Sequence, residues 1–146
     1  MARMPYAFFY GGYMNPDVLR ASGTQPMDCE IGYVEGLRLT VGPLANLEES
    51  KGSRAYGLLA RLSHEDLSRL YGGDPAALQG IVYLPEAVLV HTINGQTIPA
   101  MTYICPTLSG GIADAAYVAK LVVAAEKIGL PADYVSHLRD IAVPQR

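Results

Sequence analysis

The sequence predicts an α+β fold with a substantially antiparallel sheet, and three observations support this prediction. Five apolar runs bounded by Gly, Pro or Asn, all before residue 106, have the composition of β-strands. The pair Asn94-Gly95 separates the last two runs, which is a strong signal for a hairpin of antiparallel strands. The two longest helical patterns follow the last strand, and this segregation of strands and helices is typical of α+β folds.

The strands are expected at residues 6–10, 31–41, 54–62, 81–90 and 98–105, which are rich in Val, Ile, Leu or Tyr. Between the first two, Asn15-Pro16-Asp17 predicts the start of a helix, because proline is favoured at the first helical position.

Three further helices are predicted from their ends and their spacing. In LSHEDLSRLYGG, Ser63 and Asp66 have the spacing of a capping box, and the two glycines predict where the helix stops. The alanine-rich stretch GIADAAYVAKLVVAAEKIG is expected to end at Gly129. The last helix is expected to begin with Pro131 in its first turn and to repeat apolar residues at helical intervals from Tyr134 onward.

Length and composition predict a single domain over residues 1–146, large enough to bury a core without disulfides or metals. A net charge of −3 and the absence of a basic stripe argue against nucleic acid or an anionic membrane surface as a partner. Cys29 and Cys105 are far apart, and the three histidines share no ligand spacing, so no metal site is predicted. No apolar run is long enough to span a bilayer, and we expect a cytoplasmic monomer or homodimer.

The stretch AFFYGGYMNP contains the first candidate site. An apolar strand that runs into Gly11-Gly12 can turn consecutive backbone N–H groups outward, because glycine adds no Cβ and tolerates unusual backbone angles. A helix start at Asn15 adds free amide donors and the positive end of a helix dipole nearby. The loop is therefore either an anion-binding cradle or an ordinary Gly-Gly turn, and spacing alone does not decide between them.

Several segments together resemble the γ-glutamylcyclotransferase (AIG2-like) family. FFYGGYMNPDVL is similar to its strand, YGSN loop and helix, and GPLANLEESKGSRAYGLLARLSHEDLSRL resembles the following turn, strand and short helix. GIVYLPEAVLV resembles a tyrosine-bearing strand of the family, and EKIGLPADYVSHLRDI its closing helix. The resemblance covers nearly the whole chain. It implies a γ-glutamylcyclotransferase-like fold, in which a mixed, mostly antiparallel sheet or barrel has flanking and C-terminal helices.

The activity that the resemblance implies is closure of a γ-glutamyl amide or amine conjugate to 5-oxoproline, with release of the amine and without a cofactor. This reaction needs a cradle for the substrate α-carboxylate, a base for the ammonium proton and donors for the developing oxyanion. The family base is a Glu, and aligning LYGGDPAALQGIVY places Asp74 at that position; an ordinary Gly-Gly-Asp-Pro turn is the alternative. Glu86 in YLPEAVLV is the second candidate acid, and Glu48-Glu49 is more simply an exposed acidic loop.

The substrate-binding residues that the resemblance implies are the loop residues Tyr10, Gly11, Gly12, Tyr13 and Met14 together with two tyrosines, Tyr83 and Tyr134. Tyr10 is expected to anchor the loop by packing. Tyr13 departs from the family, which has small polar residues here, so its ring either narrows the pocket or stacks on an aromatic leaving amine.

The remaining tyrosines, Tyr33, Tyr56, Tyr103 and Tyr117, are expected in the core or on the surface. The predicted partner is therefore a small γ-glutamyl substrate. The alternative is a protein of the same fold whose altered acid and loop bind or process a different small amide or ligand.

Overall fold

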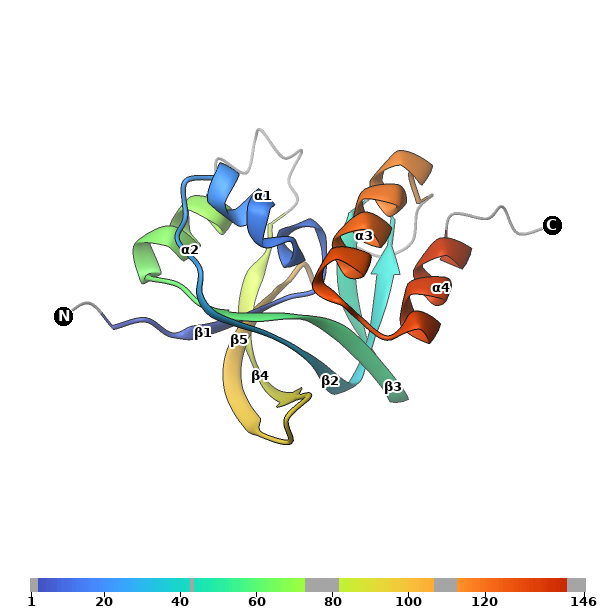
Figure 1. Ribbon diagram of the computed structural model, residues 1–146, viewed down its shortest axis with the longest axis horizontal. Coiled ribbons are helices and arrows are strands. Elements are labelled where there is room, and N and C mark those ends of the chain that lie inside the picture. The colour runs from blue at the N-terminus through green and yellow to red at the C-terminus, as the bar shows by residue number, and fades with distance from the viewer. Residues whose placement is uncertain (1–2, 43, 73–81, 107–112, 142–146) are drawn as a thin grey trace.

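The computed structural model describes residues 3–42, 44–72, 82–106 and 113–141, and it contains a small β-barrel with helices at one end and along one side. The five strands are β1 (Tyr6–Phe9), β2 (Met27–Val41), β3 (Ala45–Arg61), β4 (Leu84–Thr92) and β5 (Thr97–Ile104). They close in the order β1-β3-β2-β4-β5, and Figure 1 shows them crossing beneath the helices. Only β1 and β5 pair in parallel, through Ala7 and Met101, so the sheet is mixed and mostly antiparallel, as predicted.

The hairpin of β2 and β3 is longer than the sequence pattern predicted. The prediction began the third strand at residue 54 and left residues 45–53 as a loop, but β3 begins at Ala45 and pairs it with Val41. Polar and charged residues dominate this half of β3, so no alternation of apolar residues marks it as a strand. Backbone pairing with residues 37–41 of β2 forms it, and Glu48 lies in the strand opposite Arg38 rather than in a loop.

The predicted helix starts are confirmed by their caps. The side chain of Asn15 accepts a hydrogen bond from the Asp17 N–H at 3.0 Å, and α1 (Pro16–Ala21) follows directly. The Ser63 hydroxyl accepts from the Asp66 N–H at 3.1 Å and caps α2 (His64–Tyr71).

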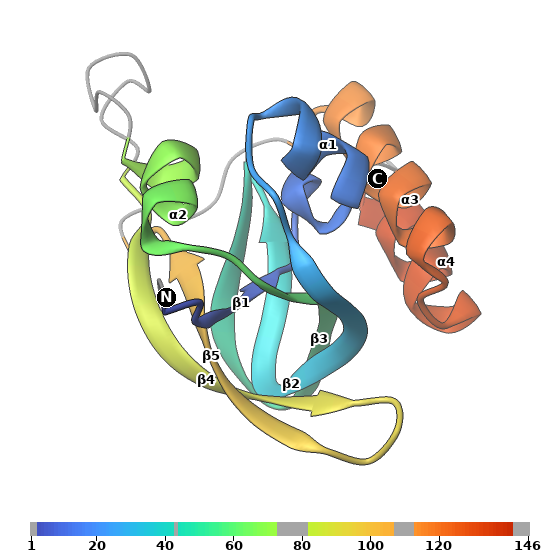
Figure 2. The same cartoon turned by 60° about the vertical axis from the view of Figure 1, so that its left-hand side comes forward.

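The two C-terminal helices pack as a pair beside the barrel. They are α3 (Ala115–Ile128), which ends at Gly129 with φ +83, and α4 (Ala132–Ile141). Figure 2 shows this pair along one side of the barrel, while α1 and α2 cover the end from which β1 emerges. The predicted hairpin is confirmed too, with Gly95 at φ +89 in the turn between β4 and β5.

The core brings the end of β1 close to β3. Phe8 and Phe9 are each 1% exposed and pack with Leu58 and Leu59 of β3. A Cβ at Gly57 would lie 2.1 Å from the Phe9 carbonyl oxygen, so only glycine permits this approach of the two backbones. The fold therefore fixes the point where β1 ends and the loop of Gly11 and Gly12 begins.

Candidate functional site

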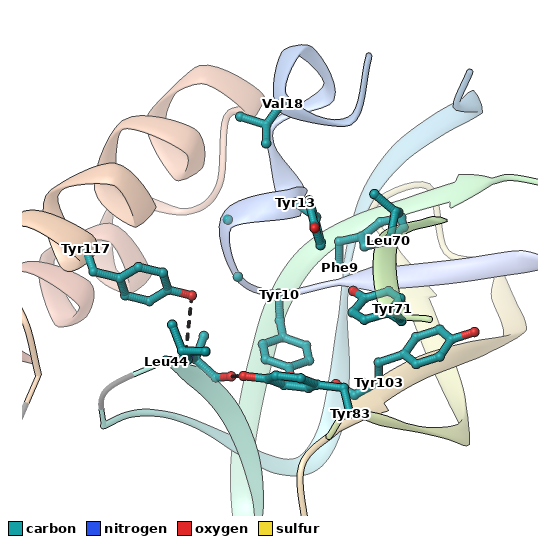
Figure 3. A pocket seen from close by; sticks show the side chains of 13 residues that line it. Phe9, Tyr10, Tyr13, Val18, Leu44, Leu70, Tyr71, Tyr83, Tyr103 and Tyr117 are labelled. Atoms are coloured by element: carbon teal, nitrogen blue, oxygen red, sulfur yellow. Dashed lines mark hydrogen bonds between the residues drawn. The ribbon is translucent and has the colours of Figure 1, made fainter. Parts of the chain in front are cut away.

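A cavity of about 330 Å³ opens where β1 ends, between the barrel and the helices. Its size falls at the lower end of the range for small-molecule sites. The described residues that line it are mostly aromatic and apolar: Phe9, Tyr10, Gly11, Gly12, Tyr13, Val18, Leu44, Ala45, Leu70, Tyr71, Tyr83, Tyr103 and Tyr117. Five of the seven residues predicted to bind substrate are among them, namely Tyr10, Gly11, Gly12, Tyr13 and Tyr83 (Figure 3).

The segment of residues 10–14, which we call the glycine loop, contains a short 3₁₀ helix, η1 (Gly12–Met14). The N–H groups of Met14 and Asn15 are used within this turn, by the carbonyls of Gly11 and Gly12. The N–H groups of Gly12 and Tyr13 stand at the start of the turn, where no carbonyl of the same turn can accept them. The Gly12 N–H lies beside the Tyr117 oxygen, so among the described residues the Tyr13 N–H is the amide of the loop that is left for a ligand.

The two glycines have different surroundings. A Cβ at Gly11 would lie 3.1 Å from the Ala45 Cβ, whereas a Cβ at Gly12 would meet no atom within 4 Å. Gly12 is also absent from the residues with positive φ, so its backbone does not require glycine. The significance of Gly12 is therefore the open space beside its amide.

The backbone of Ala45 joins two tyrosines of the cavity. The Tyr83 hydroxyl donates to the Ala45 carbonyl at 2.6 Å, and the Ala45 N–H donates to the Tyr117 oxygen at 3.2 Å. No residue in the described part of the chain accepts the Tyr117 proton. The Tyr117 O–H can therefore donate into the cavity, while the Tyr83 oxygen presents lone pairs.

Burial raises the pKa of Tyr117, although the N–H groups of Ala45 and Gly12 beside its oxygen partly oppose that rise. Burial is also the main cause of the raised pKa of Tyr83. Both hydroxyls are therefore neutral hydrogen-bonding groups near pH 7.

A buried side-chain amide fixes the position of Ala45. Asn46 is 3% exposed, and its amide group donates to the Cys105 carbonyl at 2.9 Å and accepts from the Cys105 N–H at 3.0 Å. These two bonds tie the start of β3 to the residue that follows β5. The start of β3, whose Ala45 bonds to Tyr83 and Tyr117, is therefore held in place by the Cys105 backbone.

Tyr10 lies at the centre of the cavity floor in Figure 3 and is anchored, as expected. It is 5% exposed, and its hydroxyl donates to the Tyr103 carbonyl at 2.6 Å. Burial raises its pKa well above the ordinary value, and the neighbouring tyrosines, Cys105 and Glu86 add to that rise.

Four rings form what we call the aromatic wall: Phe9, Tyr13, Tyr71 and Tyr103. Tyr13 meets Phe9 and Tyr71 edge to face, with ring centroids 6.3 and 5.7 Å apart. Tyr71 stacks on Tyr103 at 3.8 Å with an interplanar angle of 9°. Such contacts hold each ring in one orientation, so this side of the cavity is a preformed apolar surface.

Of the two candidate acids, Asp74 and Glu86, the structure describes Glu86. Asp74 lies outside the described residues. Glu86 is exposed on β4 and does not line the cavity, but it pairs with Thr102, which is fully buried. Since directly opposed residues share one face of a sheet, Glu86 is on the inward face, and its charge contributes to the raised pKa of Tyr10.

Two predicted substrate-binding residues lie elsewhere. Met14 is 0% exposed and packs in the core, because η1 turns its side chain inward. Tyr134 does not line the cavity: α4 packs it against Tyr56, with ring centroids 5.0 Å apart. Its hydroxyl is buried and forms no hydrogen bond to a described residue. Met14 was predicted to bind through its backbone amide and Tyr134 through its hydroxyl, but the Met14 N–H donates to the Gly11 carbonyl and neither residue lines the cavity.

Three tyrosines of the cavity were not predicted, because each comes from a different element. Tyr71 ends α2, Tyr103 lies on β5, and Tyr117 lies in the first turn of α3. From the sequence, Tyr103 and Tyr117 are expected in the core or on the surface, and no pattern assigns a role to Tyr71. The one available signal was composition, since ten tyrosines against two phenylalanines suggest polar aromatic surroundings.

The described residues contain no group of three or more His, Cys, Asp or Glu side chains that could hold a metal ion. None of their helices combines the length and apolar character needed to cross a membrane.

Solved structures with the same fold include a γ-glutamyl cyclotransferase, with a TM-score of 0.82 and 17% identity, covering 99% of this chain and 90% of that one. An uncharacterized protein from Homo sapiens matches with a TM-score of 0.79 and 18% identity, and the match covers 98% of this chain and 89% of that one. A yeast γ-glutamyl cyclotransferase specific to glutathione matches with a TM-score of 0.60 and 11% identity, and the match covers 95% of each chain. At these identities the likeness establishes the fold alone.

No curated protein matches the sequence. The model of the AIG2-like family, however, matches residues 54–138, which is more than half of the chain and includes β4, β5 and most of both C-terminal helices. The predicted resemblance is confirmed, and the chain belongs to the AIG2-like family.

Proposed function

We propose that this protein is a γ-glutamyl cyclotransferase-like enzyme that converts a γ-glutamyl amide or amine conjugate to 5-oxoproline and releases the amine. One observation carries the proposal: in a chain of the AIG2-like family, the glycine loop opens into a cavity of small-ligand size. The γ-glutamyl cyclotransferase structures of the same fold support it.

The glutamyl end of the substrate would bind between the glycine loop and Tyr117. The N–H of Tyr13 and the O–H of Tyr117, whose oxygen lies beside the N–H of Gly12, are donors on one side of the cavity, and together they suit the α-carboxylate. The Tyr83 oxygen, whose proton is given to Ala45, is an acceptor for the α-ammonium group.

The chemistry is an intramolecular acyl transfer. A base removes a proton from the α-ammonium group, and the freed amine attacks the γ-carbonyl carbon to form the lactam C–N bond. The attacking nitrogen loses a second proton as the lactam forms, the bond to the leaving amine breaks, and the two protons leave with that amine as its ammonium ion. Holding the amine against the γ-carbonyl supplies much of the rate, because the cavity restricts the flexible glutamyl chain to the reactive conformation.

The proposed base is Asp74, which stands at the position of the family Glu and lies outside the described residues. Glu86 is the second candidate because it is on the inward face of β4 and its charge helps to raise the pKa of Tyr10.

The test is a pair of isosteric variants assayed for 5-oxoproline release by mass spectrometry. Asp74→Asn should fold, retain binding of a γ-glutamyl amide and lose turnover by roughly 10²-fold or more, the usual scale for a positioned acid–base group. Glu86→Gln is the matched control and should keep most of its turnover. The reverse pattern would assign the base to Glu86.

The alternative is a binding protein, or an enzyme for a different small amide, that uses the same cavity. What supports it is the departure that the family resemblance implies: Asp74 aligns with the family Glu, and Gly12 and Tyr13 align with small polar loop residues. If the parent protein releases no 5-oxoproline from a varied panel of γ-glutamyl amines and peptides, the alternative replaces the cyclotransferase.

A further inference from the structure

We infer that the part of the cavity facing the aromatic wall is a subsite for an uncharged aromatic amine, and that Tyr13 determines this preference. The inference rests on the proposed function, because it names the class of leaving group that the γ-glutamyl substrate carries.

The cavity has two chemically different sides. On one side, the Tyr117 hydroxyl lies beside the glycine loop, within 3.5 Å of the position that a Cβ of Gly11 would occupy. On the other side, Figure 3 shows Tyr13, Phe9, Leu70 and Tyr71 grouped away from Tyr117. If the glutamyl group occupies the polar side, the leaving amine must lie against the aromatic wall and Leu70.

The described lining disfavours a charged leaving group. None of the lining residues in the described ranges is Lys, Arg, His, Asp or Glu. A carboxylate, as in a dipeptide leaving group, would lose its hydration there without gaining a cationic partner. A neutral amine with an apolar substituent carries no such penalty.

The geometry of the wall favours a ring over an aliphatic chain. Tyr13 is held edge to face against Phe9 and Tyr71, and Tyr71 is held by stacking on Tyr103. These contacts order the wall before a ligand arrives, so a ligand ring gains offset or edge contacts without the entropic cost of arranging the tyrosines. The volume of about 330 Å³ suits a glutamyl group with one ring rather than a longer peptide.

Three synthetic ligands separate the effects of ring and charge. They are γ-glutamyl-phenethylamide, γ-glutamyl-ethylamide as the neutral reference, and γ-glutamylglycine, which adds a carboxylate. Calorimetric binding is measured for each alongside 5-oxoproline release. The phenethylamide should bind about tenfold or more tightly than the ethylamide, which is the scale of discrimination for an apolar subsite, and γ-glutamylglycine should bind more weakly than the ethylamide.

Two variants of Tyr13 test its role. Tyr13→Ser removes the ring and should reduce the preference for the phenethylamide over the ethylamide to about threefold or less, whereas Tyr13→Phe should retain the preference. An equal loss of affinity for both ligands in Tyr13→Ser would overturn the assignment, because the residue would then act on the loop as a whole.

Val18→Lys is a second test that does not depend on the loop. Val18 lines the cavity from α1 and is 40% exposed, so a lysine there can be accommodated without burying its charge. This variant should raise the affinity for γ-glutamylglycine relative to the ethylamide severalfold. No change in that ratio would argue against a leaving-group subsite at this position.

The failures of the two proposals are distinguishable. Ring-dependent binding without release of 5-oxoproline keeps the aromatic subsite and rejects the cyclotransferase. Release of 5-oxoproline with equal affinity for the phenethylamide and the ethylamide keeps the cyclotransferase and rejects the subsite. Absence of binding by all three ligands rejects both.

Discussion

At the scale of single residues, two neighbouring glycines have separate tasks. Gly11 is confined by Ala45 and Tyr117, so a side chain there would be in tight contact with Ala45. Gly12 has open space where a side chain would start, and that space belongs to the cavity. One glycine lets the loop pass close to β3, and the other leaves room for a ligand.

Gly12→Val should therefore block binding without lowering stability. The added side chain meets no described atom within 4 Å of its Cβ and enters the ligand's space. We expect an unchanged melting temperature and a loss of affinity for γ-glutamyl-ethylamide of tenfold or more, on the order expected when a cavity is filled. The measurements are thermal unfolding and calorimetry.

Gly11→Ala is the matched control with the opposite stability outcome. Its Cβ, 3.1 Å from that of Ala45, is in tighter contact than most Cβ atoms tolerate and requires Ala45 to move by a few tenths of an ångström, so we expect a loss of about 1 kcal/mol in the free energy of unfolding. If Gly12→Val binds as tightly as the parent, the glycine loop is not part of the ligand site.

At the scale of elements, the first residues of β3 connect the barrel to the cavity. Ala45 bonds to two tyrosines that line the cavity, Tyr83 and Tyr117. The next residue, Asn46, bonds to the backbone of Cys105, which follows β5. This short segment thus serves both the strand pairing and the site.

Asn46→Ala should lower stability and weaken ligand binding together. It removes two hydrogen bonds to the buried Cys105 backbone, and each buried group that loses a partner costs about 1–3 kcal/mol. We expect the free energy of unfolding in urea to fall by about 2–4 kcal/mol.

The control for this variant is Gln96→Ala beside the exposed hairpin turn, where only the Gln96 backbone makes hydrogen bonds to described residues; it should cost less than about 1 kcal/mol and leave binding unchanged. Equal effects of the two variants would mean that Asn46 does not support the site.

At the scale of the whole molecule, burial of tyrosines makes stability sensitive to alkali. Burial is the main cause of a raised pKa for seven of the ten tyrosines: Tyr10, Tyr13, Tyr71, Tyr83, Tyr103, Tyr117 and Tyr134. The fold raises the pKa of Tyr134 to about 12, against about 10 in the unfolded chain.

The free energy of unfolding should therefore be constant with respect to these groups below about pH 10 and should fall above it. Above pH 10 the unfolded chain loses tyrosine protons that the folded protein keeps, so each such tyrosine lowers stability by about 1.4 kcal/mol per pH unit. For Tyr134 this fall ends as the pH passes about 12. Urea unfolding between pH 8 and 11 measures the fall, and phenolate absorbance of the folded protein counts the tyrosines that ionise.

Tyr134→Phe provides the control, because it should make the decline above pH 10 less steep. Full ionisation of all ten tyrosines near pH 10 in the folded protein would contradict the predicted fall in stability.

The sequence by itself determined the features that depend on neighbouring residues. The caps at Asn15 and Ser63, the hairpin at Asn94-Gly95 and the helix end at Gly129 each involve hydrogen bonds or backbone angles within a few positions. The family resemblance extended this to the fold.

Only the tertiary structure decided which side chains meet in the cavity. Tyr117 bonds to a residue 72 positions away and Tyr10 to one 93 positions away, and no local pattern encodes such contacts. The same is true of the first half of β3, which is a strand because β2 pairs with it, and of Tyr134, which α4 packs against Tyr56 instead of the cavity. Periodicity assigns a residue to an element, but the closure of the barrel decides what that residue contacts.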